Sequence, residues 1–301
     1  MNSEQSASRP YLIGVLLVFV GAILYATKAI FVKLAYDYEV ESVILLALRM
    51  LFALPVYLWF AFRSPFPANQ PPPTRKETWL TIAVGIMGYY LASLFDFVGL
   101  QYITASMERL VLYIYPTLVL LISWLAFGQR INRTQWLALL LAYLGIGVVL
   151  LGDASIQEQT NLWLGAGWVF LAALFFAGYI VGNGQLVQRF GTKRFTAYSM
   201  LAATAAILIH SLIQGHWPEL AWQVYGYGLL MAMVATVIPS FLITEGIRRI
   251  GASSASIIGS IGPVSTIILA YLFLDERLGW VQWLGTAIVM TGILLITLRK
   301  G

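Results

Sequence analysis

The chain has 301 residues, of which 60% are hydrophobic and 10% charged, whereas soluble domains carry about 25% charged residues, so an ordinary water-soluble protein is excluded. It contains no cysteine, which excludes disulfide frameworks, thiol catalysis and cysteine-ligated metals. The net charge of +5 comes without a separate Lys/Arg cluster, so it indicates the basic loops of a membrane protein and no nucleic-acid partner.

Ten stretches are long and apolar enough to cross a bilayer, for which a helix needs about 20 residues. The first begins at Tyr11 and is too long for the apolar region of a signal peptide. The connection 63–78 contains three consecutive prolines and is expected to be a solvated linker. The predicted fold class is an all-α integral membrane protein with ten transmembrane helices: 11–36, 42–62, 79–100, 104–127, 133–151, 162–188, 194–213, 222–245, 252–274 and 279–298.

The charged residues of the connections predict the orientation. If the N-terminus is cytoplasmic, nearly all loop Lys and Arg fall on the inner side, with Arg277 as the exception, and Glu41 and Glu219 fall outside. Positively charged loops stay in the cytoplasm. We therefore expect both termini inside, in a multi-pass protein of the cell (inner) membrane whose partner is the lipid bilayer.

The sequence contains an internal duplication. The stretch from Gly99 to Trp136 recurs from Gly246 to Trp283 without a gap, at a shift of 147 that carries Pro116 onto Pro263. The first expected helix recurs in the sixth at a shift of 151. Five helices thus repeat as five, and an odd number forces the copies into opposite orientations. The predicted domains are two inverted repeats, residues 11–151 and 162–298.

Two stretches carry a resemblance to a known family. They read GLQYITASMERLVLYIYPTLVLLISWLAFGQRINRTQW and GIRRIGASSASIIGSIGPVSTIILAYLFLDERLGWVQW. Each has a mid-helix proline, a polar exit and a Gln-Trp pair that opens the next helix. Both resemble the fourth and ninth helices of the drug/metabolite transporter superfamily, in its EamA-type bacterial branch. The resemblance covers nearly the whole chain and implies ten helices as five plus five, and export of amino acids, drugs or other metabolites.

Five ionisable residues lie away from the ends of the first four expected helices or beside their short outer turn, where each costs about 2.5–3.5 kcal/mol to insert. At about 1.5 Å per residue, all five lie within roughly 12 Å of the outer interface. The second repeat does not keep this pattern, so the architecture does not require the charges. Two interpretations stay open: an ion-pair network that docks the first four helices, or a pathway for substrate and ions. The residues are Lys28, Arg49, Asp96, Glu108 and Arg109.

Prolines and tyrosines supply the other candidates. Pro116 and Pro263 lie near the middle of their helices, where proline removes a backbone hydrogen bond. Each is interpreted as a hinge for alternating access, or as a static bend. Tyr113 lies near the first proline, and Tyr179 replaces Lys28 in the second repeat. These two rings either line a cavity and stack on a substrate or face lipid.

The predicted function is secondary active transport, as an exporter of a small polar or amphipathic metabolite such as an amino acid. No nucleotide-binding motif is present, so the driving force is expected to be a gradient, with protons carried by Asp96 and Glu108. Lys28, Arg49 and Arg109 are candidates to hold a substrate carboxylate. The alternative is a non-transporting membrane enzyme or structural subunit. No cofactor or metal is expected, and monomer and dimer stay equally open.

Overall fold

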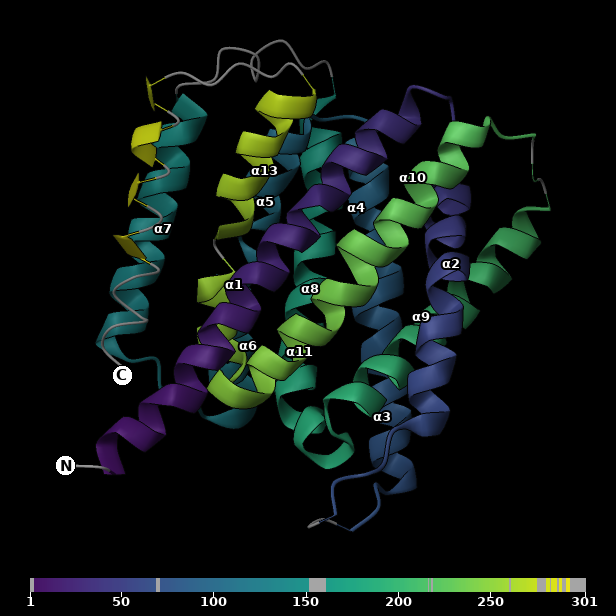
Figure 1. The fold of residues 1–301 in the computed structure, drawn as a ribbon. Helices are drawn as coiled ribbons and strands as arrows, with labels where there is room; N and C mark the ends of the chain where they lie inside the picture. Colours follow the sequence, from purple (N-terminus) through teal and green to yellow (C-terminus); the bar gives the residue numbers. More distant parts are fainter. Residues whose placement is uncertain are drawn as a thin grey trace.

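The computed structural model describes residues 3–68, 71–151, 161–215, 217, 219–259 and 261–274, and further along 280, 281, 283–285, 287, 288, 291 and 292. Every regular element in these ranges is a helix (Figure 1). The first half holds α1 (Ser3–Tyr36), α2 (Ser42–Arg63), α3 (Arg75–Gly85), the π-helix η1 (Ile86–Leu91), α4 (Ala92–Leu100), α5 (Ala105–Leu112), α6 (Tyr115–Phe127) and α7 (Arg133–Leu151). The second half holds α8 (Leu162–Phe190), α9 (Thr192–Gln214), α10 (Trp222–Ala232), the π-helix η3 (Met233–Val237), α11 (Ile238–Ile250), α12 (Ala252–Ile258) and α13 (Ile261–Phe273).

Seven helical stretches in the described ranges are long and apolar enough to cross a membrane. They are Arg9–Tyr36, Ser42–Arg63, Arg75–Leu100, Leu162–Phe190, Thr192–Gln214, Trp222–Ile250 and Ala252–Phe273. Residues 133–151 form the helix α7, as expected, while most of the expected helix 279–298 lies outside the described residues. The protein is therefore an all-α, multi-pass membrane protein, and the count of ten helices stays a prediction.

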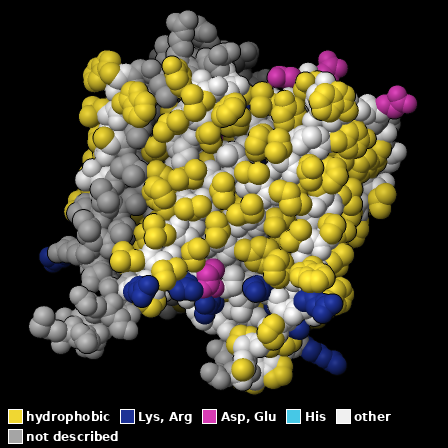
Figure 2. Space-filling model, in the orientation of Figure 1, with side chains coloured by type: hydrophobic (Ala, Val, Ile, Leu, Met, Phe, Trp, Pro, Cys, Tyr) yellow, Lys and Arg dark blue, Asp and Glu magenta, His cyan; other side chains and the backbone are white. Residues whose placement is uncertain are grey.

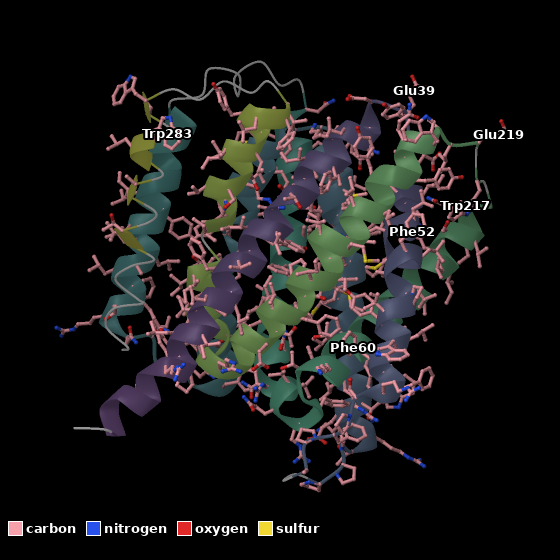
Figure 3. All side chains as sticks on the ribbon, in the orientation of Figure 1. Glu39, Phe52, Phe60, Trp217, Glu219 and Trp283 are labelled. Atoms are coloured by element: carbon pink, nitrogen blue, oxygen red, sulfur yellow. The ribbon has the colours of Figure 1, made fainter. Side chains whose placement is uncertain are left out.

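The surface has the layered polarity of such a protein. Figure 2 shows a broad apolar belt, with Lys and Arg side chains gathered along its lower rim and acidic side chains mostly at its upper rim. Glu39 and Glu219 lie at the upper end, opposite the start of α1 (Figures 1 and 3). An apolar belt between charged rims suits the hydrocarbon core of a bilayer between its two interfaces.

The helices that carry the repeated prolines are interrupted. α5 ends at Leu112 and α6 begins at Tyr115, one residue before Pro116. In the second half, α12 ends at Ile258 and α13 begins at Ile261, just before Pro263. Proline lacks an N–H and clashes with the preceding turn, but it is tolerated in the first turn of a new helix. Each expected single helix is therefore two half-helices that meet inside the bundle.

The two halves share a second irregularity. η1 begins at Ile86 and η3 at Met233, which are related by the same shift of 147 as the prolines. A π-helical turn inserts an extra residue and is often found at functional sites. The sequence did not reveal these turns, because the segments IMGYYL and MVATV contain no proline or other residue that predicts a π-helix.

Close helix contacts repeat between the halves. An added Cβ at Gly246 of α11 would lie 2.3 Å from Val18 Cγ2 of α1. The equivalent Cβ at Gly99 of α4 would lie 2.5 Å from Val169 Cγ2 of α8. Small residues allow such close approach of membrane helices. The first helix of each half therefore packs against the third helix of the other half.

Candidate functional site

Four of the predicted site residues form one buried charge cluster. The Lys28 ammonium group lies 2.5 Å from Asp96 Oδ2, and both residues are 1% exposed. Arg109 Nε lies 3.1 Å from Glu108 Oε2, and Glu108 is fully buried. The electrostatic neighbours of Asp96 include Glu108 and Arg109 as well as Lys28. The cluster joins α1, α4 and α5 and carries two formal charges of each sign.

Aromatic rings hold the cations of this cluster. Tyr25, one helical turn before Lys28, has the Lys28 Nζ at 4.9 Å and the Arg109 Cζ at 5.7 Å from its ring centroid. Cations over a ring face are attracted by its electron density, most strongly where water is excluded. Arg49 also has Tyr25 and Asp96 among its electrostatic neighbours. Its Nη2 donates to Ser93 Oγ at 3.0 Å, and its Cζ lies 5.2 Å from the Phe97 centroid.

Several polar atoms of the cluster have no hydrogen-bond partner among the described residues. They are both oxygens of Glu108, Oδ1 of Asp96, and Nε and Nη2 of Arg109. The 3.1 Å contact of Arg109 with Glu108 is therefore a charge contact without hydrogen-bond alignment. Unsatisfied buried polar groups are costly, so the energetic cost of burying this cluster is only partly offset by its two ion pairs.

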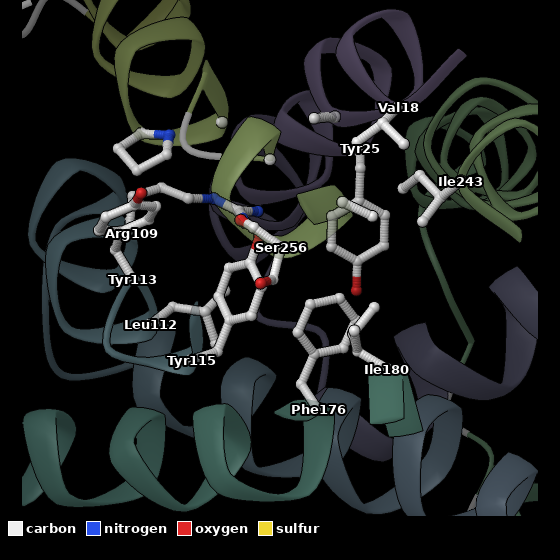
Figure 4. Close-up of a pocket in the computed structure, with 15 residues that line it drawn as sticks. Val18, Tyr25, Arg109, Leu112, Tyr113, Tyr115, Phe176, Ile180, Ile243 and Ser256 are labelled. Atoms are coloured by element: carbon white, nitrogen blue, oxygen red, sulfur yellow. The ribbon is translucent and has the colours of Figure 1, made fainter. Parts of the chain in front are cut away.

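The central cavity, of about 50 Å³, lies beside the cluster (Figure 4). Arg109 extends toward its centre, and the rings of Tyr25 and Phe176 stack in its wall, with centroids 6.0 Å apart and planes 10° apart. These two aromatic residues occupy matching positions in the two repeats, at the shift of 151. The cavity is lined by Val18, Ala22, Tyr25, Arg109, Leu112, Tyr113, Tyr115, Phe176, Ile180, Ile243, Ala255, Ser256, Gly259, Gly262 and Pro263.

A second, more polar cavity of about 210 Å³ shares α6, α8, α11 and α12 with the first and lies toward the end of the bundle where α6 ends and α12 begins. Its lining includes Ser123 of α6, Gln185 of α8 and Ser253 of α12. Tyr115 lines the 50 Å³ cavity. The Tyr115 hydroxyl donates to the Ser256 carbonyl oxygen at 3.0 Å. A Cβ added at Gly259 would lie 2.3 Å from the Tyr115 hydroxyl oxygen. One aromatic side chain thus seals α6 against α12.

Some of the predicted site residues line the central cavity and others lie outside it. Tyr113 and Pro263 line the central cavity with Arg109, whereas Pro116 is buried at the start of α6. Tyr179 is buried but is not part of the cavity lining. Its hydroxyl group is 2.9 Å from that of Tyr89 and accepts from Asn183 Nδ2 at 3.1 Å. Lys28, Arg49, Asp96 and Glu108 also lie outside the lining.

The prediction missed Tyr25 and Phe176, which form the aromatic wall. A signal was available, because an aromatic residue stands at both repeat positions and Tyr25 precedes Lys28 by three residues on one helix face. The described residues contain no group of three or more His, Asp or Glu side chains that could hold a metal ion.

Comparisons with known proteins agree with this architecture. The model of the EamA-like transporter family matches residues 12–151 and again 163–298. The chain is 33% identical to the uncharacterized transporter YcbK of Bacillus subtilis, over 99% of this chain and 98% of that protein. It is 27% identical to the uncharacterized transporter sll1319 of Synechocystis, over 96% and 94%. A crystal structure of a protein has the same fold, with a TM-score of 0.74 at 19% identity, covering 95% of this chain and 97% of that chain.

A bundle of apolar spanning helices that matches transporters along its whole length is a membrane transporter. This chain belongs to the EamA-like transporter family, as its resemblance to that branch of the drug/metabolite transporter superfamily predicts. The family and the names of the relatives point to a transporter rather than an enzyme.

Proposed function

We propose that this protein is a secondary active exporter of a small polar or amphipathic metabolite, driven by protons and working by alternating access. The observation that carries the proposal is the buried cluster of Lys28, Asp96, Glu108 and Arg109 beside a cavity lined by both halves. Ionisable residues at membrane depth are expensive and mark substrate and proton pathways.

Alternating access requires two halves that exchange roles. The proposed arrangement is an inverted repeat, with residues 11–151 and 162–298 related by an axis in the membrane plane. Its support is the pair of equivalent crossings, α1 on α11 and α8 on α4, because a two-fold axis produces each contact twice. The basic lower rim and the acidic upper rim support cytoplasmic termini and a place in the cell (inner) membrane.

The proposed route runs through the two cavities. Substrate enters the polar 210 Å³ cavity from the cytoplasm and reaches the central cavity when Tyr115 releases Ser256. The breaks before Pro116 and Pro263 are the proposed hinges, because half-helices are not held together by a continuous backbone ladder. Rocking at both breaks closes the inner side while it opens the outer one.

Asp96 and Glu108 are the proposed proton carriers. Asp96 is stabilised as a carboxylate by Lys28, whereas both oxygens of the fully buried Glu108 are unsatisfied. Burial favours the neutral form of a carboxyl group, and a neighbouring carboxylate favours it further. A proton therefore has two adjacent carboxyl groups to occupy, and loss of that proton leaves Glu108 to pair with Arg109.

The test is transport in proteoliposomes with and without an imposed proton gradient, using a labelled panel of amino acids and of the monocarboxylates with the same side chains. Asp96→Asn and Glu108→Gln are compared with Glu219→Gln, an exposed control. We expect Glu108→Gln to keep downhill exchange and to lose its response to the gradient. Full gradient-driven transport in both buried variants would contradict the coupling role. Loss of monodisperse protein in both would favour a purely structural ion-pair network.

A further inference from the structure

We infer that the central cavity binds the carboxylate of a compact monoanionic organic acid, with Arg109 as the counter-ion and the Tyr25–Phe176 stack as the platform for an apolar tail. This inference rests on the proposed transport function and narrows its substrate class. It selects one cation from the three that the sequence offers, and it excludes zwitterions and amines.

Arg109 is the cation that lines the cavity: its Nε lies 3.1 Å from Glu108, while the other end of its guanidinium can still bind a ligand. It is 5% exposed, it lines the cavity, and its Nη2 has no hydrogen-bond partner among the described residues. Lys28 is occupied by Asp96, and Arg49 donates to Ser93, and neither of the two cations lines the cavity. A planar guanidinium with unused N–H groups matches the two oxygens of a carboxylate.

The interrupted helices add to this preference. The first residues of α6 and of α13 line the cavity beside Arg109, represented by Tyr115 and Gly262. Each of these helices is 13 residues long, and the N-terminus of a helix carries partial positive charge and favours an anion. The ends of α5 and α12 reach the same cavity at Leu112 and Gly259 and offset part of this charge, so Arg109 contributes most of the preference for an anion.

The other residues that line the cavity determine which groups the ligand can carry besides its carboxylate. None of the described lining residues is Asp or Glu, so a ligand ammonium group meets no acidic partner in the cavity. Most lining side chains are apolar or aromatic, with the stacked Tyr25 and Phe176 rings opposite the cation in Figure 4. A volume of about 50 Å³ holds only one or two water molecules at about 30 Å³ each, so the walls of the cavity must move apart to admit an organic acid. The small volume and the apolar walls favour a monocarboxylate with a short branched or small flat tail.

The test uses three probes that share one branched apolar tail: isovalerate, valine and 3-methylbutylamine. Equilibrium binding of each labelled probe is measured on the purified full chain in detergent. We expect isovalerate to bind at least tenfold more tightly than valine and more tightly still than the amine. Tighter binding of valine or of the amine, or no isovalerate binding by monodisperse protein at millimolar concentration, would overturn the inference without any variant.

Variants then assign the cation. Arg109→Gln is expected to weaken isovalerate binding at least tenfold. Arg109→Lys is expected to keep an intermediate affinity, because an ammonium supplies charge without the planar pair of donors. Arg63→Gln, at an exposed arginine, is the control. Unchanged isovalerate binding in a monodisperse Arg109→Gln protein contradicts the assignment. If Arg109→Gln does not fold, the affinity of the Arg109→Lys variant for isovalerate and the ranking of the three probe affinities test the assignment instead.

The two proposals fail separately. Isovalerate binding in detergent without any gradient-driven flux in proteoliposomes would refute the transport proposal and leave the binding inference standing. Gradient-driven flux of the amine or of valine, without isovalerate binding, would refute the binding inference and leave the transport proposal standing.

Discussion

Replacing Lys28 by Met removes one partner of the Lys28–Asp96 ion pair, while the Met side chain fills most of the space that the Lys side chain occupied. The two charged atoms lie 2.5 Å apart and both residues are 1% exposed. At an effective dielectric constant of about 20, a pair at that distance attracts by roughly 7 kcal/mol, part of which offsets desolvation. Losing one partner of a buried pair costs about 3–5 kcal/mol in unfolding free energy, which we expect for Lys28→Met.

The double variant Lys28→Met/Asp96→Leu is the matched control. It removes both charges and leaves Glu108 and Arg109, whose opposite charges cancel. We therefore expect its free energy of unfolding to lie within about 2 kcal/mol of that of the parent. For a protein of this size, a loss of 3–5 kcal/mol lowers the melting temperature by roughly 6–20 °C. Thermal loss of monodisperse protein in detergent at pH 8 measures the shift. A Lys28→Met protein that melts with the parent, or a double variant no better than the single one, would refute the reasoning.

Two further predictions concern packing and access. Gly246→Ala is expected to lower the unfolding free energy by about 1–3 kcal/mol, because the added Cβ meets Val18, whereas Gly226→Ala, with no atom within 4 Å of the added Cβ, is expected to be neutral or slightly stabilising. The same melting assay tests both, and equal shifts would contradict the close contact. Tyr115→Phe removes the seal on α12, so a cysteine placed at Ala255 of this cysteine-free chain should react several-fold faster with a maleimide from the cytoplasmic side. An unchanged labelling rate would show that Tyr115 does not close the passage.

Properties that depend on runs of residues were predictable from the sequence. The apolar stretches, the duplication at a shift of 147 and the family follow from length, hydropathy and order alone. The cost of a lone charge in lipid also predicted that the ionisable residues of the first half would find partners. The pairing of Lys28 with Asp96 satisfies that requirement across α1 and α4.

Tertiary structure decided which side chain faces which neighbour. Successive side chains on a helix point about 100° apart, so the neighbouring residues Glu108 and Arg109 face different surroundings. Of the two, only Arg109 lines the cavity. The pairing of Tyr25 with Phe176 needed α1 and α8 to approach each other, although these rings are 151 positions apart in the sequence. Proline predicted an irregularity in each repeat, but only the tertiary structure brings both helix breaks to one cavity. Helix rotation and crossing depend on contacts between distant segments, and hydropathy along the chain carries no record of them.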